Sequence, residues 1–266
     1  MFGPSLGGLL FDYGGFPLPF FVEGGITIGV AAVMLILLKD DSTEEAAISH
    51  DSSQVTWIQI LKADGVLISF FVLTFAGSSW AWFSASLGPF LTNEFSLSFT
   101  KTGLVFMASG CAYTIFTPIC GYLTDKGLDG MLAMFIGNVL IAIGFTILGP
   151  IPPFKAISGH LWLTVFSLVL QGIGSAATFL GSLLYMMKSI LAAGLPDNDQ
   201  SNGMVSSLWI VGDCAGGFFG SLLGGVAYDA LGFKAGTLVE FGLICFTVLI
   251  IVIYIFVKRN RLCSKT

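Results

Sequence analysis

Long apolar segments alternate with short polar ones along almost the whole chain. Seven of these segments reach the roughly 20 apolar residues that a helix needs to cross a bilayer, and they span residues 17–38, 64–90, 102–123, 131–150, 161–185, 204–228 and 235–257. Residues 1–11 have the composition of the last third of an eighth span. The pattern predicts an all-α membrane protein, a bundle of transmembrane helices joined mostly by short turns.

An internal repeat relates two distant parts of the chain. Residues 3–25 match residues 220–242 without gaps, at a constant offset of 217 and with ten identities in 23 positions. Apolar helices resemble one another by composition, but both copies also share an Asp, a Glu and a glycine turn between two helices. Counting the helices between the copies gives a repeat unit of six. Two six-helix halves in parallel repeat are typical of secondary transporters.

The only long polar connection, residues 39–60, divides the chain. It separates residues 1–38, the end of one half, from residues 61–258, which hold a complete six-helix half, and residues 259–266 form a tail. The acidic run in this connection is interpreted as a solvated linker. Because the chain opens inside a helix, we expect the working protein to have further N-terminal helices before Met1.

Composition and charge agree with a membrane protein. Hydrophobic residues make up 55% of the chain and charged residues 10%, whereas a soluble domain carries roughly 25% charged residues. If the tail is cytosolic, eight of the 11 Lys and Arg residues face the cytosol, and Lys101, Lys155 and Lys234 lie outside, as the positive-inside rule requires. We expect lipid as a partner, and neither a nucleic-acid partner, a cofactor, a metal ion nor enzymatic activity.

Two motifs carry a resemblance to a known family. The loop Gly121-Tyr-Leu-Thr-Asp-Lys-Gly127 contains G-x-x-x-D-[KR] at a cytosolic position, which resembles the loop signature of the major facilitator superfamily. The segment Gly3-Pro4-Ser5-Leu6-Gly7-Gly8 resembles the end of the fifth-helix motif of its proton-coupled antiporters. The stretch from Gly121 to Trp162 is most similar to the vesicular amine transporter group, particularly its polyamine branch.

This resemblance implies a major facilitator-type helical bundle, in which the chain supplies the end of helix 5 and helices 6 to 12. It implies a secondary active transporter that exchanges a small organic solute, with amines and polyamines among the candidates, for protons by alternating access. A vesicular and a plasma-membrane location both stay open. In the family the loop Asp holds one gated state, so the candidate gating residues are Gly121, Asp125 and Lys126; a solvated turn is the alternative.

Glycines at helical spacing predict close packing between helices. The span 204–228 carries four glycines spaced by four residues, so they share one face: Gly212, Gly216, Gly220 and Gly224. Small residues let a neighbouring helix approach closely in lipid, where no hydrophobic force drives association. The same packing role is expected for the motif near the N-terminus, at Gly3, Pro4, Gly7 and Gly8.

Asp213 is the first candidate for a proton or substrate site. Its span begins near residue 204, so nine residues at ~1.5 Å each place it ~14 Å deep, near the centre of a ~30 Å hydrocarbon layer. A charged carboxyl there costs at least ~2.5–3.5 kcal/mol. It should therefore face a wet cavity, be paired, or be protonated; a structural acid with hydrogen-bond partners is the alternative.

Other polar and aromatic residues in the spans are weaker candidates for substrate contact. In the resemblance helix 10 lines the central cavity, which makes Gln171 a candidate. The weaker candidates that follow are Ser78, Ser79, Trp80, Trp82 and Tyr113, although aromatic residues in spans more often serve packing. Glu23 and Glu240, matched in the repeat, lie on helices that are peripheral in the family and are expected to be structural or interfacial acids.

Two other functions stay open at this point. Seven complete spans are also typical of a heptahelical receptor, although the short connections, the repeat and the glycine-rich helices argue against it. The chain is alternatively a truncated product without transport activity, because a central cavity needs both halves.

Overall fold

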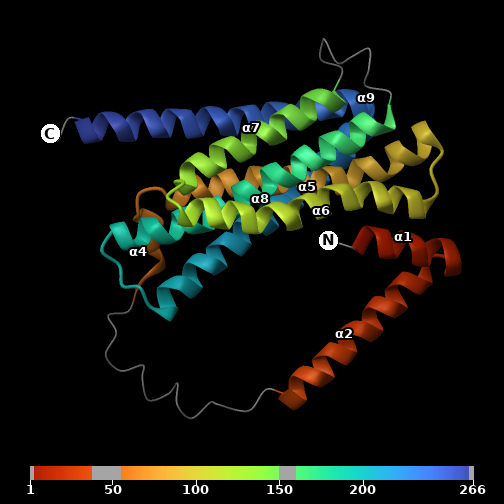
Figure 1. Cartoon of the computed structure of the whole chain (residues 1–266), viewed down its shortest axis with the longest axis horizontal. Coiled ribbons are helices and arrows are strands. Elements are labelled where there is room, and N and C mark those ends of the chain that lie inside the picture. Colours follow the sequence, from red (N-terminus) through yellow and green to blue (C-terminus); the bar gives the residue numbers. More distant parts are fainter. Residues whose placement is uncertain (1–2, 38–54, 150–159, 264–266) are drawn as a thin grey trace.

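The computed structural model describes residues 3–37, 55–149 and 160–263, and these residues are helical apart from short turns (Figure 1). The helices are α1 (Gly3–Gly14), α2 (Pro17–Leu37), α4 (Trp57–Lys62), α5 (Val66–Phe95), α6 (Phe99–Asp125), α7 (Gly130–Leu148), α8 (Leu161–Ala192) and α9 (Asp199–Cys263). Six of these helices are long and apolar enough to cross a membrane. The prediction of an all-α membrane bundle is confirmed.

The helix α9 contains two spans. Its backbone leaves the helical region at Gly232 (φ 75°, ψ 169°), and Figure 1 shows the chain turning back there. We call residues 199–231 the first segment of α9 and residues 233–263 its second segment. With this break counted, the helices match the seven spans expected from the sequence.

Both copies of the repeat place a glycine with positive φ between their two helices. Gly15, between α1 and α2, has φ 69°, and its counterpart Gly232 has φ 75°. Glycine adopts this left-handed conformation without the steric penalty that a Cβ would bring. The repeat read from the sequence is therefore also a repeat of backbone conformation.

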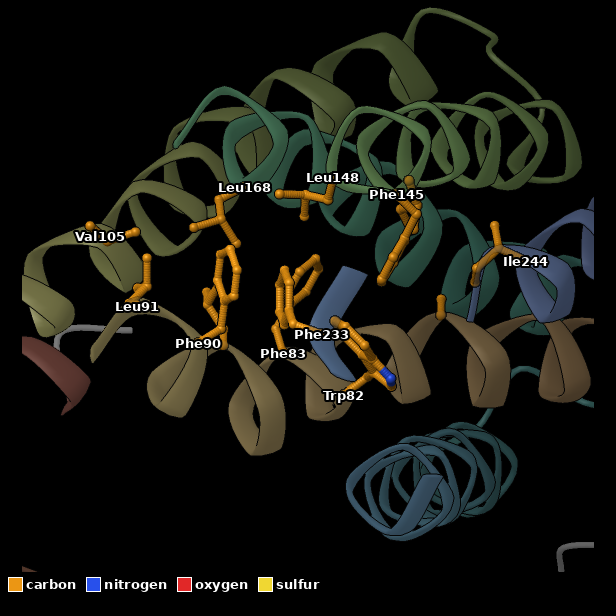
Figure 2. Packing of buried hydrophobic residues seen from close by; sticks show 13 residues of the cluster. Trp82, Phe83, Phe90, Leu91, Val105, Phe145, Leu148, Leu168, Phe233 and Ile244 are labelled. Carbon is orange, nitrogen blue, oxygen red and sulfur yellow. The ribbon is translucent and has the colours of Figure 1, made fainter. Parts of the chain in front are cut away.

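Helix α5 lies at the centre of the bundle formed by α5 to α9 (Figure 1), packed against α8 and both segments of α9. Helix α7 covers α8 and α9, and α6 covers α8. An aromatic cluster fills the space between α5, α7 and α9 (Figure 2). In it Phe90 stacks on Phe233 with ring centroids 3.9 Å apart, and Phe83 stacks on Phe145 at 4.8 Å. Such pairs add to the free energy gained by burying the rings.

The first two helices stand apart from this bundle. Helix α1 packs on α6, whereas α2 leans away from the other helices (Figure 1). No described residue of α2 is buried, although its sequence is apolar throughout. In a membrane these side chains lie against lipid or against further helices.

Helix ends differ from the predicted spans by a few residues. The spans expected at 64–90 and 161–185 continue to Phe95 in α5 and to Ala192 in α8. Helix α4 overlaps the end of the expected linker and buries Ile60 completely. The rest of that linker, residues 39–54, and Lys155 lie outside the described residues.

Candidate functional site

Three consecutive residues of α5 contact polar side chains from three different spans. A Cβ built at Gly77 would lie 3.1 Å from Asp213 Oδ1 in the first segment of α9. Ser78 Oγ lies 2.6 Å from Glu240 Oε1 in the second segment. Ser79 Oγ accepts a hydrogen bond of 3.0 Å from Gln171 Nε2 in α8. We call Gly77, Ser78 and Ser79, with these three partners, the polar layer.

Gln171 is the polar side chain of this layer that borders a cavity. Only 1% of the residue is exposed, and its Oε1 has no hydrogen-bond partner among the described residues. Ser79 donates to the carbonyl of Ala76 at 2.7 Å, which fixes its lone pairs toward Gln171. A buried amide oxygen without a partner is costly, so a donor from water or a ligand would satisfy it.

The cavity beside Gln171 has a volume of about 250 Å³. Its wall combines aromatic and small polar side chains from α5, α6 and α8, a composition that suits a small organic molecule. The described lining residues are Gly3, Trp80, Phe83, Ser84, Phe106, Ser109, Gly110, Leu168 and Gln171. Of these, Gln171 and Trp80 are among the substrate contacts predicted from the sequence.

The aromatic residues that are candidates for substrate contact lie in different environments. Trp82 is completely buried in the aromatic cluster, against Phe83, Phe145 and Phe233 (Figure 2), and it does not line this cavity. Trp80, two residues earlier, faces the cavity instead. Tyr113 is half-buried and packs edge-on against Trp80, with ring centroids 5.9 Å apart. It therefore supports the cavity wall from behind.

Asp213 lies in the polar layer and is half-buried. The absence of a side chain at Gly77 makes room for its carboxyl group beside α5. Among the described residues it has neither an ion pair nor a hydrogen bond through its side chain.

The four glycines of the first segment of α9 lie against α5. Each successive glycine faces a residue one helical turn further along α5. A Cβ at Gly216 or Gly220 would overlap the backbone of Thr74 or Ser78, and a Cβ at Gly224 would lie 3.0 Å from the Trp82 carbonyl. Gly212 meets the side chains of Phe70 and Leu73. The stripe therefore allows the close approach that brings Asp213, in the same segment, to α5.

The N-terminal motif packs differently. A Cβ at Gly8 would overlap the carbonyl of Phe99 at the start of α6, and Ser5 donates a 2.7 Å hydrogen bond to the carbonyl of Gly103. At Gly3 and Gly7 a Cβ would meet no described atom within 4 Å. Pro4 lies within α1, and its side chain is outside the described set.

The loop after α6 forms a tight helix end. Asp125 is the last residue of α6, and Gly127 follows with φ 107°. Lys126 lies over the ring of Tyr122, 4.6 Å from its centroid, and a Cβ at Gly121 would lie 3.7 Å from Leu180 Cδ2. Asp125 is exposed and has no side-chain hydrogen bond or ion pair within the described part of the chain. Its gating role stays a prediction.

Glu240, which the sequence predicts to be a structural or interfacial acid, also belongs to the polar layer. It is completely buried at α5, whereas its repeat counterpart Glu23 is exposed on α2. The sequence signal was present, since an acid in the middle of a span is costly wherever it lies. No group of three or more His, Cys, Asp or Glu side chains that could hold a metal ion occurs within the described ranges.

Comparison with known proteins gives a consistent result. The family model described as Major Facilitator Superfamily matches residues 69–262. The MFS-type transporter SLC18B1 of Mus musculus is 31% identical over 234 residues, which are 87% of this chain and 50% of that protein. SLC18B1 of Homo sapiens is 27% identical over the same length, covering 87% of this chain and 49% of that protein. The chain thus spans about half the length of the curated relatives it matches.

Proposed function

The chain belongs to the Major Facilitator Superfamily, and we propose that its polar layer binds a small organic solute that is exchanged for protons by alternating access. Membership of this transporter family sets aside the receptor alternative. It also agrees with the resemblance to the vesicular amine transporter group that the stretch from Gly121 to Trp162 carries. In the proposed function the chain supplies one wall of the pathway, and the other wall comes from N-terminal helices of the same protein.

The observation that carries this proposal is the buried Gln171 beside an aromatic-lined cavity. Its unpartnered Oε1 would accept a hydrogen bond from a solute N–H or O–H group. Trp80, Phe83 and Phe106 provide apolar and π surfaces for the rest of the solute. An amine or polyamine fits this wall well, because ammonium groups are attracted to aromatic faces and donate to carbonyl oxygens.

Asp213 is the group that would couple the solute to protons. A half-buried carboxyl without a described counter-charge stabilises either a proton or a cationic group, but not both at once. The solute and the proton compete for this one carboxylate. When a cationic solute binds on one side of the membrane, the proton is therefore released on that side. Return of the protonated site then resets the transporter, which gives antiport.

We further propose that the tail after Lys258 faces the cytosol, because this orientation puts eight of the 11 Lys and Arg residues inside. The end of α6 with Asp125 and Lys126 is then cytosolic, as the gating role requires.

The test uses the whole transporter in proteoliposomes with an imposed proton gradient. Radiolabelled spermidine and a labelled monoamine serve as probes. Wild type should accumulate at least one probe when the lumen is acid, and Asp213→Asn should lose accumulation while keeping gradient-free exchange. Asp229→Asn, an exposed acid of the same helix, should behave as wild type. Accumulation that is unchanged in Asp213→Asn would remove Asp213 from coupling.

A further inference from the structure

Glu240 is completely enclosed by the helix bundle. The residue has 0% exposure, and its Oε1 lies 2.6 Å from Ser78 Oγ. Its other oxygen, Oε2, has no hydrogen-bond partner among the described residues. An ionised carboxylate with one hydrogen bond in such a place is strongly disfavoured unless a cation lies beside it.

The helices packed on Glu240 supply no such cation. Helix α7 contains no charged residue, and the only charged residue of α5, Glu94, pairs with Lys234 at the opposite end from the cytosolic tail. Helix α8 carries only Lys188, near its end. The first segment of α9 presents Asp213, a second acid, to the neighbouring residue Gly77.

The hydroxyl of Ser78 connects Glu240 to the backbone of α5. Ser78 Oγ lies 2.6 Å from Glu240 Oε1 and 2.7 Å from the carbonyl oxygen of Phe75. A hydroxyl has one hydrogen, so it can donate to only one of these two acceptors. If Ser78 donates to Phe75, then the short contact to Glu240 requires a proton on the carboxyl group, which donates to Ser78.

We propose that Glu240 is a proton-binding site, separate from Asp213, whose proton is donated to Ser78 and enclosed between α5 and the second segment of α9. Loss of the proton reverses the hydrogen bond: Ser78 turns from the Phe75 carbonyl to the carboxylate. The proton passes to water that enters when α5 and α9 separate. Only the role of this site in transport rests on the proposed proton-coupled function. That Glu240 holds a proton follows from how the helices pack around it.

Infrared spectroscopy tests proton occupancy directly. A protonated carboxyl group absorbs above the amide I band, whereas ionised carboxylates absorb below it. The 266-residue chain in an ester-free detergent at pH 7 should show this carboxylic acid band. The band should persist in Glu23→Gln, the exposed repeat counterpart, and the Glu240 component should disappear in Glu240→Gln. The spectrum of Asp213→Asn identifies any contribution of Asp213 to this carboxylic acid band.

Ser78→Ala provides a second, independent measurement should Glu240→Gln fold poorly. Removal of the hydrogen-bond acceptor should shift the Glu240 band to higher frequency without abolishing it. An identical acid band in wild type and Glu240→Gln, or no band shift in Ser78→Ala, would overturn the proposal. Neither measurement involves transport, so failed uptake in proteoliposomes would contradict the proposed function and leave this result standing.

Discussion

The carboxylate of Asp12 accepts two hydrogen bonds from Thr100, one from the backbone N–H at 2.9 Å and one from the hydroxyl. Asp12 lies in the last turn of α1, and Thr100 lies in the first turn of α6, where backbone N–H groups have no partner within the helix. The contact joins the part of the chain before the long polar connection to the part after it. It therefore ties α1 to the start of α6.

Replacement of Asp12 should loosen this junction. In Asp12→Asn the amide loses the negative charge that favours a helix N-terminus, so α1 should separate from α6 more often. Spin labels at the exposed residues Tyr13 and Lys101 would report a broader and longer distance distribution. The matched control is Asp229→Asn, the repeat counterpart. An unchanged distance distribution in Asp12→Asn would show that α1 is held by other contacts.

The same junction should respond to acid. The hydrogen bonds from the Thr100 side chain and backbone lower the pKa of Asp12 below its usual 3.8. A group with a lowered pKa in the folded state stabilises that state above its ordinary pKa and loses the effect as pH falls through the lowered value. The Tyr13–Lys101 distance should therefore stay constant down to about pH 4 and lengthen below it. In Thr100→Val the transition should move to higher pH.

Close packing of α9 on α5 predicts a large difference between two neighbouring glycines. Gly220→Ala should lower the free energy of unfolding by about 1–3 kcal/mol, the usual range for overpacking, because its Cβ overlaps the backbone of Ser78. Gly217→Ala should be neutral or stabilising, since a Cβ there meets no described atom within 4 Å. Thermal unfolding of both variants in detergent measures the difference. Equal effects would show that the stripe does not set the helix spacing.

Gln171 and Asn138 are two buried amides with different expected roles. Gln171→Leu in the whole transporter should raise KM about tenfold, as expected from the loss of one hydrogen bond of ~1.5 kcal/mol, with little change in thermal stability. Asn138 donates to the Met134 carbonyl and to Thr178, between α7 and α8. Asn138→Leu should lower stability and leave KM unchanged. The reverse pattern would place the solute elsewhere.

Topology can be checked with single cysteines in a background without the native ones. An impermeant maleimide should label positions 101 and 234 from outside intact cells, and positions 126 and 188 only after permeabilisation. Labelling of positions 101 and 126 from the same side would contradict the direction assigned to α6.

The sequence was sufficient for the fold because bilayer length and apolar composition determine where helices lie. The repeat also predicted a turn at Gly15 and Gly232, since both copies need a residue that tolerates positive φ. The glycine spacing predicted a packing face on α9, but not that α5 is its partner.

The site was harder to predict because α5 is apolar on all sides. Its sequence carries no periodicity that tells which face meets the cavity, and residues two apart differ by ~200° around a helix. Trp82 and Trp80 are therefore indistinguishable by composition, although one is in the core and the other in the cavity wall. Likewise Glu23 and Glu240 are equivalent in the repeat, and only tertiary packing decides which is buried.

The consecutive positions of Gly77, Ser78 and Ser79 have a mechanical consequence. Successive residues of a helix point ~100° apart, so their three contacts surround α5. A turn of α5 about its own axis would move all three residues away from their partners together, and no rotation can release one contact while keeping the other two. Rotation of α5 about its own axis is thus opposed on three sides at once, and its release requires that α8 and both segments of α9 move away from it.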